Sequence, residues 1–219
     1  GYGLVPKDRH DLSLIKTILS TGSPLGEESY DYVYTSIKED VQLSSITGGT
    51  DIISSFAGGN ATLPVYRGEI QCRALGMKVE SFDDSGKPLI NQKGELVCTR
   101  AFPSMPVNFW NDPDGSKFHN AYFSDYPGVW THGDYILIND HGGVIVFGRS
   151  DATLNPAGVR IGTAEIYRVV EAFPEIEDSL AVGQQWEGDE RVILFVKMNE
   201  GKQFTKDLEK KLTDVIRNS

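Results

Sequence analysis

The sequence has 219 residues, of which 39% are apolar and 24% are charged, and its net charge is −10. A chain of this length can form one large domain, or a large and a small domain, around a real hydrophobic core. It has no cluster of Lys and Arg that could hold a phosphate backbone, so nucleic acid is excluded as a partner. No apolar run approaches the roughly 20 residues that cross a bilayer, which predicts no membrane span. No basic stretch followed by an apolar run opens the sequence, and we expect a cytosolic protein.

The two cysteines, Cys72 and Cys98, lie in separate strand-like runs. They are too far apart in the sequence for a metal knuckle and too few for a disulfide framework. We therefore expect two buried thiols in a reducing compartment.

Residues 1–62 have the pattern of an α/β layer. Residues 12–21 end in an apolar run and a Thr-Gly-Ser-Pro turn, which predicts a strand. Tyr30, Val33, Tyr34 and Ile37 recur at helical spacing and predict an amphipathic helix. Residues 41–46 are expected to form a second strand. The Gly-rich loop after it then lies at the carboxyl edge, where such layers bind ligands.

Between residues 63 and 148 the pattern changes to short strands separated by turns. Alternating side chains predict strands at residues 68–74, 77–82, 94–99, 134–139 and 143–147. We expect these strands to form an antiparallel β-barrel subdomain that serves mostly as scaffold.

Residues 149–219 are expected to form a small α+β domain. Two apolar stripes at helical spacing enclose two predicted strands, at residues 179–185 and 191–198. The stripes consist of Ile166, Val169, Val170 and Phe173, and of Leu208, Leu212, Val215 and Ile216.

The run Gly48-Gly49-Thr50-Asp51 combines groups that suit a phosphate. Glycines allow close backbone approach, Thr can donate to a phosphate oxygen, and a carboxylate can hold Mg²⁺ bridging to the same phosphate. The run lacks the Lys of a P-loop, and an ordinary turn remains the alternative.

Asp134 follows Gly133 at the start of a predicted strand. Its carboxylate could accept bonds from both hydroxyls of a ribose, and the alternative is a carboxylate that caps a turn. His132 could act as a base, but no nucleophile stands near it in the sequence, so a turn histidine is the preferred interpretation.

The segment 148–166 is the most specific motif in the chain. It reads Gly-Arg-Ser-Asp, then Asn-Pro-Ala-Gly, and ends in Val-Arg-Ile-Gly-Thr-Ala-Glu-Ile. This string resembles the hinge motif of the adenylate-forming enzymes, the superfamily that contains the acyl-CoA synthetases. Its Asn-Pro and Gly-Thr resemble the branch of acetyl-CoA and acetoacetyl-CoA synthetases. The weaker runs follow in the order that the family has them, and Gly94-Glu95-Leu96 is similar to a strand of its β-rich subdomain.

The resemblance implies an adenylate-forming fold. Residues 1–148 would be the C-terminal part of its large AMP-binding domain, and residues 149–219 its small mobile C-terminal domain, cut short. It implies the following roles: Gly22, Ser23 and Pro24 at adenine; Gly49, Thr50 and Arg160 at phosphate; Asp134 and Arg149 at ribose; Asp51 at Mg²⁺; Gly48 in the acyl pocket; Ala157 and Gly158 at CoA; and Asp151 as the hinge.

The implied reaction joins a carboxylic acid to CoA through an acyl-adenylate made from ATP. Gly48 stands where acetyl-CoA synthetases have Trp, which implies an acid larger than acetate, with acetoacetate favoured. The chain departs from the family's motifs at two positions. Asp51 stands where the family usually has the longer Glu, and His132 stands where it usually has Thr. We assign no catalytic residue, since the family's upstream Lys loop and C-terminal Gly-Lys are absent from the chain.

We therefore expect a fragment that begins downstream of its natural start, works with the rest of its parent chain, and shows no ATP–pyrophosphate exchange alone. Three alternatives remain: a ligase for propionate or butyrate, a non-catalytic nucleotide-binding module, and a purely structural role for every motif.

Overall fold

The computed structural model describes residues 3–154, 156, 161–186 and 189–218. The chain divides into two compact units, Gly1–Val146 and Phe147–Ser219, called here the larger and the smaller unit. Each has a hydrophobic core of its own. None of the helices within the described residues is long and apolar enough to span a bilayer.

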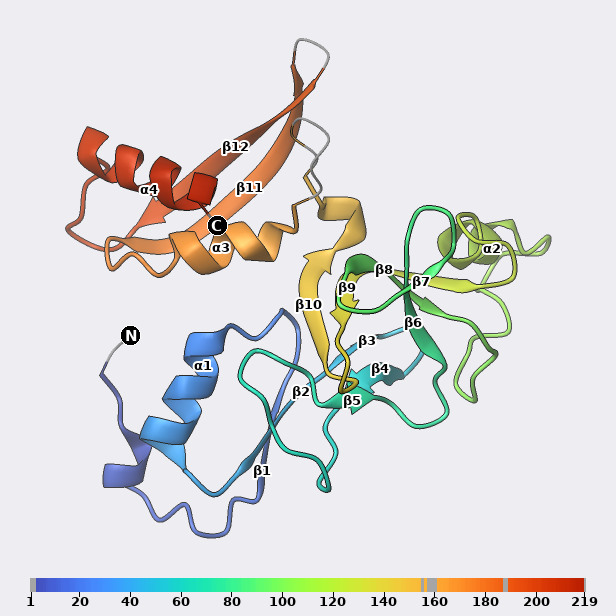
Figure 1. The fold of residues 1–219 in the computed structure, drawn as a ribbon, viewed down its shortest axis with the longest axis horizontal. Helices are drawn as coiled ribbons and strands as arrows, with labels where there is room; N and C mark the ends of the chain where they lie inside the picture. Colours follow the sequence, from blue (N-terminus) through green and yellow to red (C-terminus); the bar gives the residue numbers. More distant parts are fainter. Residues whose placement is uncertain (1–2, 155, 157–160, 187–188, 219) are drawn as a thin grey trace. The chain divides into compact units, whose positions relative to one another are not determined.

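The larger unit opens with a small α/β layer (Figure 1). Its elements are η1 (Pro6–Asp8), β1 (Thr17–Ser20), α1 (Glu27–Tyr32), the π-helical segment η2 (Val33–Ile37) and β2 (Gln42–Ser45). The predicted helix and both strands are confirmed. Strands β1 and β2 pair in parallel, with Ser20 opposite Ser45. Tyr30 and Val33 of the helical segment and Leu43 of β2 are buried in one cluster, which is the apolar stripe that the helical spacing indicated.

A hydrogen bond ties α1 to the chain that leads into the β-rich region. The hydroxyl of Tyr30 donates to the backbone carbonyl of Glu69 at 2.7 Å. Burial, reinforced by Tyr34 and Glu69, raises the pKa of Tyr30 to about 12, so this hydroxyl stays protonated and remains a donor at neutral pH.

A short sheet follows, and the sequence predicted only one of its strands, the one expected at residues 68–74. Strands β3 (Thr47–Gly49), β4 (Ser54–Gly58) and β5 (Cys72–Arg73) form a three-stranded antiparallel sheet in this order. Thr47 and the two glycines after it belong to β3, and the turn comprises residues 50–53. The turn prediction was thus correct only for the second half of the run.

The β-rich region is an open sheet and not the barrel that we expected. Its strands are β6 (Val79–Phe82), β7 (Pro88–Leu89), β8 (Lys93–Cys98), β9 (Trp130–Ile138) and β10 (Val144–Arg149), in the order β10-β9-β8-β6-β7. Among the described residues β10 and β7 are its two edges. Strand β7 is only two residues long and begins with Pro88, which has no N–H to donate, as is typical of an edge strand.

The sheet packs its apolar side chains into one core. Leu96 of β8 and Ile136 of β9 are fully buried there, together with Cys98. Burial raises the pKa of the Cys98 thiol, whereas Cys72 is only half-buried. The expectation of two buried thiols is therefore correct for one of them, and both cysteines are free.

Helix α2 (Ser116–Tyr122) was not predicted. The buried carboxylate of Asp112 accepts the backbone N–H groups of Lys117 and Phe118, at 3.1 and 2.9 Å, and so satisfies the start of the helix. Gly115 precedes the helix with φ +70°. Aromatic residues of α2 then pack on Trp130 of β9, which is buried.

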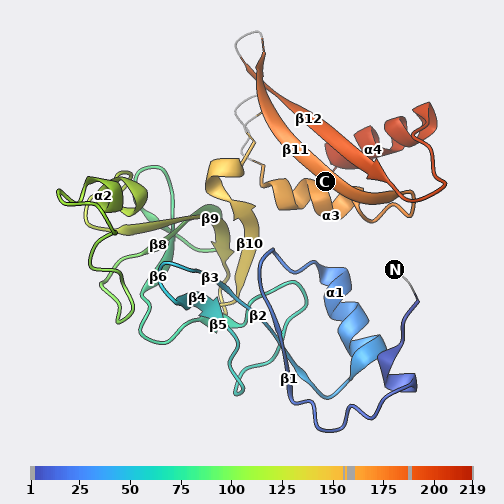
Figure 2. The same cartoon turned by 180° about the vertical axis from the view of Figure 1, so that it is seen from behind.

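The smaller unit is a strand pair covered by helices on one side (Figures 1 and 2). Its elements are η3 (Ser150–Ala152), α3 (Thr163–Val170), β11 (Ile176–Trp186), β12 (Asp189–Met198) and α4 (Lys206–Asn218). The predicted order of helix, strand, strand and helix is confirmed. Ala181 opposite Leu194 packs against the helices, whereas the next pair, Leu180 and Phe195, points away and is exposed.

Two glycines bring the end of β10 against the start of α3. A Cβ on Gly162 would lie 2.5 Å from the Phe147 carbonyl oxygen, and Gly148 adopts φ +116°. Both positions therefore require glycine, one because of close approach and the other because of its backbone conformation.

Ile53 carries backbone strain that a substitution can reveal. It is a β-branched residue at φ +48°, and its side chain is 90% exposed, so burial does not compensate for the strain. We expect Ile53→Gly to raise the free energy of unfolding of the intact protein by about 1 kcal/mol in denaturant titrations. The matched control is Ile90→Gly, since Ile90 is exposed but has no positive φ, and this change should lower stability. Equal losses in both variants would contradict the prediction.

Candidate nucleotide site

Two of the expected nucleotide motifs start from one edge of the parallel strand pair. The N–H of Ile46, just after β2, donates to the Ser20 carbonyl at the end of β1, at 3.1 Å. Gly22, Ser23 and Pro24 follow β1 within a few residues and are exposed, with Gly22 at φ +98°. The chain after β2 continues directly into β3. Both segments thus begin at the carboxyl ends of parallel strands, where α/β layers bind ligands.

Strand β3 is joined to the strand that carries Asp134. The Thr47 hydroxyl donates to Asp134 Oδ2 at 2.7 Å, and both residues are buried. His132 Nε2 lies 3.1 Å from the Gly48 carbonyl oxygen, within hydrogen-bond distance. Two motifs that stand 87 residues apart in the sequence therefore lie side by side.

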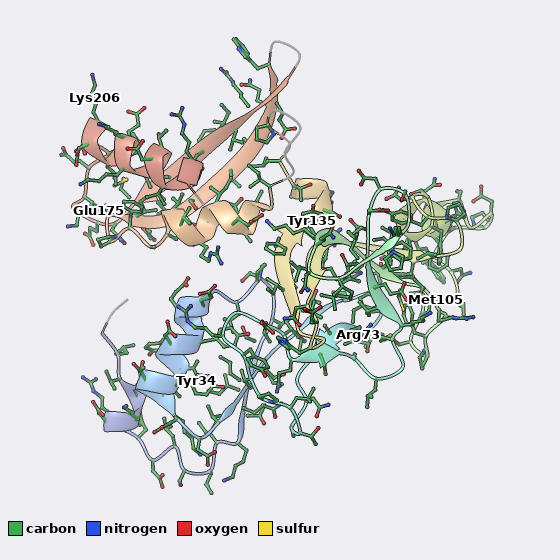
Figure 3. All side chains as sticks on the ribbon, viewed as in Figure 1. Tyr34, Arg73, Met105, Tyr135, Glu175 and Lys206 are labelled. Atoms are coloured by element: carbon green, nitrogen blue, oxygen red, sulfur yellow. The ribbon has the colours of Figure 1, made fainter. Side chains whose placement is uncertain are left out.

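A bulge in β9 turns these side chains toward β3. In the β8–β9 ladder Val97 pairs with Thr131 and Glu95 pairs with Tyr135, so the three residues 132–134 stand against Leu96 alone. Gly133 adopts φ +81°, and its N–H donates to Glu95 Oε1 at 2.8 Å. Such bulges redirect side chains next to functional sites. Tyr135, labelled in Figure 3, resumes the regular pairing and is buried.

His132 is a strand residue with a buried side chain, and its interpretation as a turn histidine was wrong. Its side chain is 8% exposed, packs edge-on against Phe56 at 4.7 Å between ring centroids, and has Nε2 3.8 Å from Asp134 Oδ2. A Cβ on Gly49 would come within 2.9 Å of the imidazole Cε1. The imidazole thus occupies the space beside Gly49, which explains why a glycine suits that position.

The position of Gly48 bears on the acyl-pocket hypothesis. A Cβ there would lie 2.3 Å from the Ser54 carbonyl oxygen and 2.6 Å from Ser55 Cα, both backbone atoms of β4. A Trp at this position would displace the β3–β4 ladder as well as fill a pocket. The substitution is consequently a poor test of acid size, and the pocket stays a hypothesis.

Thr50 and Asp51 lie in the exposed turn after β3. The hydroxyl of Tyr122, the last residue of α2, donates to Asp51 Oδ2. Sequence reasoning missed Tyr122, although the Asp-Pro-Asp-Gly turn before α2 and the spacing of Phe118 and Tyr122 were available signals.

The groups around Asp51 fit Mg²⁺ carried by a nucleotide better than a metal held by protein alone. No group of three or more His, Cys, Asp or Glu side chains that could hold a metal occurs in the part of the chain that the structure describes. Mg²⁺ in phosphate-transfer sites is commonly bound through one or two carboxylates, the substrate phosphates and water. A single exposed carboxylate such as Asp51 suits that arrangement.

The remaining candidate residues belong to the smaller unit. Arg149 Nε lies 3.3 Å from Asp151 Oδ1, and both side chains are exposed. Arg149 therefore falls in a different unit from Asp134, its expected partner at the ribose. Ala157, Gly158 and Arg160 lie outside the described residues.

A short antiparallel bridge joins Leu154 to Ile161. Leu154 and Ile161 exchange both backbone hydrogen bonds, at 2.8 and 2.7 Å. The carboxylate of Glu165 then accepts the Gly162 N–H at 2.9 Å and caps α3. The Glu of the hinge motif thus has a local structural role.

The chain is similar, in sequence and in structure, to known proteins. No protein-family model matches it. It is 57% identical over 216 residues to acetoacetyl-CoA synthetase from Gallus gallus, covering 98% of this chain and 32% of the relative. It is 55% identical to acetoacetyl-coenzyme A synthetase from Rhizobium meliloti, covering 98% and 33%. The solved structure of acetoacetyl-CoA synthetase from Streptomyces lividans matches with a TM-score of 0.89 and 44% identity, covering 98% of this chain and 33% of that one.

The chain is thus homologous, over nearly its whole length, to about one third of the acetoacetyl-CoA synthetases that it matches. Its fold is that of the matching part of an adenylate-forming CoA ligase. The resemblance inferred from the sequence is confirmed at this level.

The Thr47–Asp134 hydrogen bond can be tested through stability. Thr47→Val keeps the shape of the side chain but removes the donor to a buried carboxylate, so we expect a loss of about 1–3 kcal/mol in the free energy of unfolding. Thr47→Ser keeps the hydroxyl and should recover most of that loss. Denaturant titration of the two variants would refute the interaction if Ser and Val behaved alike.

Proposed function

We propose that this chain is part of an ATP-dependent acid–CoA ligase that activates acetoacetate as its adenylate and passes the acyl group to CoA. The observation that carries the proposal is the contact between β3 and the β9 bulge, because β3 ends at Gly49, expected at phosphate, and the bulge contains Asp134, expected at ribose. Identity of 57% to an acetoacetyl-CoA synthetase over 98% of the chain supports it.

In the proposed reaction the larger unit binds the nucleotide. Backbone N–H groups near Gly49 and the Thr50 hydroxyl contact phosphate, and residues Gly22, Ser23 and Pro24 contact adenine. Asp134 accepts the ribose hydroxyls, since the two oxygens of a carboxylate offer about four acceptor sites. Asp51 holds Mg²⁺, which neutralises charge on the phosphates when it is bound.

The smaller unit acts in both half-reactions under this proposal. Arg149 contacts ribose, Arg160 contacts phosphate, and the backbone of Ala157 and Gly158 borders the path of CoA. Asp151 is the hinge about which the smaller unit turns between adenylate formation and thioester formation. Its exposed carboxylate and its place in a single helical turn, η3, are compatible with that role.

The proposed domain assignment follows the same homology. Residues 1–148 correspond to the C-terminal part of a large AMP-binding domain, with an α/β layer at 1–62 and a β-rich subdomain at 63–148. Residues 149–219 belong to its small C-terminal domain. The cytosol is the proposed compartment, supported by the two free cysteines, because thiols persist where the environment is reducing.

The function is tested in the full-length protein that carries this chain. With acetoacetate, ATP and Mg²⁺ we expect acid-dependent ATP–pyrophosphate exchange, and Asp134→Ala should reduce it at least tenfold, because the ribose loses its acceptor. Asp140→Ala is the matched control, since Asp140 is an exposed carboxylate in the turn after the same strand.

Acetate, propionate and butyrate are assayed in parallel to identify the acid. A higher kcat/KM for propionate or butyrate than for acetoacetate would show that the preferred acid is different, while the proposed ligase reaction would stand. Binding of AMP in calorimetry without exchange for any of the acids would instead support a non-catalytic nucleotide-binding module.

A further inference from the structure

The hydrogen bond between Tyr122 and Asp51 joins two elements that are remote in sequence. Asp51 lies in the turn after β3, and Tyr122 ends α2. We infer that Tyr122 is a positioning residue: its hydroxyl fixes one oxygen of the Asp51 carboxylate and leaves the other for the Mg²⁺ of the nucleotide. This inference rests on the proposed function, in which Asp51 is the metal ligand.

The donor is held firmly in place. The Tyr122 ring stacks on Trp130 with 3.6 Å between centroids and an interplanar angle of 14°. Trp130 is itself buried in the core of the larger unit. Helix α2 is fixed at its other end by the Asp112 carboxylate, which accepts two backbone N–H groups. The hydroxyl therefore projects from a rigid aromatic base, and little freedom is lost when it forms a hydrogen bond.

The acceptor has a fixed backbone but an exposed side chain. Ile52, the next residue, is fully buried in the same core, and the N–H of Ile53 closes the turn on the Thr50 carbonyl at 3.1 Å. Asp51 itself is exposed to solvent in this turn. What the turn leaves undetermined is the rotation of that side chain, which a hydrogen bond from Tyr122 restricts.

The length of the side chain makes this restriction consequential. The Asp51 side chain is one methylene shorter than that of Glu, so few of its rotamers can reach a metal on the bound phosphates. Carboxylate ligands that receive a hydrogen bond from a neighbouring group are held in a productive orientation, and removing such a partner commonly weakens metal binding roughly 10- to 100-fold. Because Asp51 is exposed, we expect an effect near the lower bound.

The experiment separates metal binding from nucleotide binding in the full-length protein. The probe is α,β-methylene-ATP, an ATP analogue that resists cleavage between its α- and β-phosphates. Its affinity for the protein is measured by calorimetry in the presence of Mg²⁺ and again in the presence of EDTA. We expect Tyr122→Phe, which keeps the ring stack, to reduce the gain in affinity from Mg²⁺ roughly tenfold and to leave the metal-free affinity unchanged. Bound Mn²⁺, followed by electron paramagnetic resonance, should decrease in parallel.

Two further variants decide the outcome. Tyr126→Phe is the matched control, because the Tyr126 hydroxyl also donates to an aspartate, at the backbone carbonyl of Asp83 at 2.9 Å. The Tyr126→Phe variant should retain the full gain in affinity from Mg²⁺. Asp51→Ala should lose the gain. If Asp51→Ala loses it and Tyr122→Phe keeps it, the inference is overturned while the proposed function stands.

If Asp51→Ala keeps the gain, the metal assignment and the inference fail together. An equal loss of metal-free and metal-bound affinity in Tyr122→Phe, accompanied by a lower melting temperature, would show a general structural role for the hydroxyl and would also overturn the inference.

Discussion

The contact between β3 and β9 is the interaction on which the candidate site depends. It consists of a buried hydrogen bond from Thr47 to Asp134 and a second contact between His132 and the Gly48 carbonyl. Both β9 residues come from the bulge at residues 132–134, where three residues stand against Leu96 alone and the regular pairing with β8 is interrupted. Gly133 permits the bulge, and the Glu95 carboxylate satisfies the N–H that it releases from the ladder.

Packed aromatic rings next to the β9 bulge stabilise this contact. Trp130, Phe56 and Phe102 form a buried cluster under the β9 bulge, with neighbouring rings in edge or tilted contact. His132 adds its imidazole to Phe56 on the side that faces β3. Rings of this size lose little side-chain entropy when they are buried, so the cluster can fix the position of β9 against the small β3–β4–β5 sheet. The polar site is thus built on a rigid apolar base.

In the smaller unit, backbone conformation positions the motif at residues 148–166. This hinge motif is arranged by backbone geometry more than by side-chain contact: Gly148 has a positive φ, and Gly162 approaches the Phe147 carbonyl too closely for any side chain. A backbone bridge between Leu154 and Ile161 adds a further constraint. These constraints explain the glycines at positions 148 and 162 of the motif.

The sequence by itself determined the elements whose signals are local. The apolar stripes of α1, α3 and α4 and the alternation of β8 and β12 depend on neighbouring residues, and the hinge motif was long enough to indicate the family. The tertiary structure alone decided what depends on distant partners. It showed that β3 is a strand because β4 pairs with it, that the His132 side chain is buried, that the sheet is open at β7, and that Tyr122 reaches Asp51. Such contacts join residues separated by dozens of positions, and no local propensity specifies which distant side chain will fill a given space.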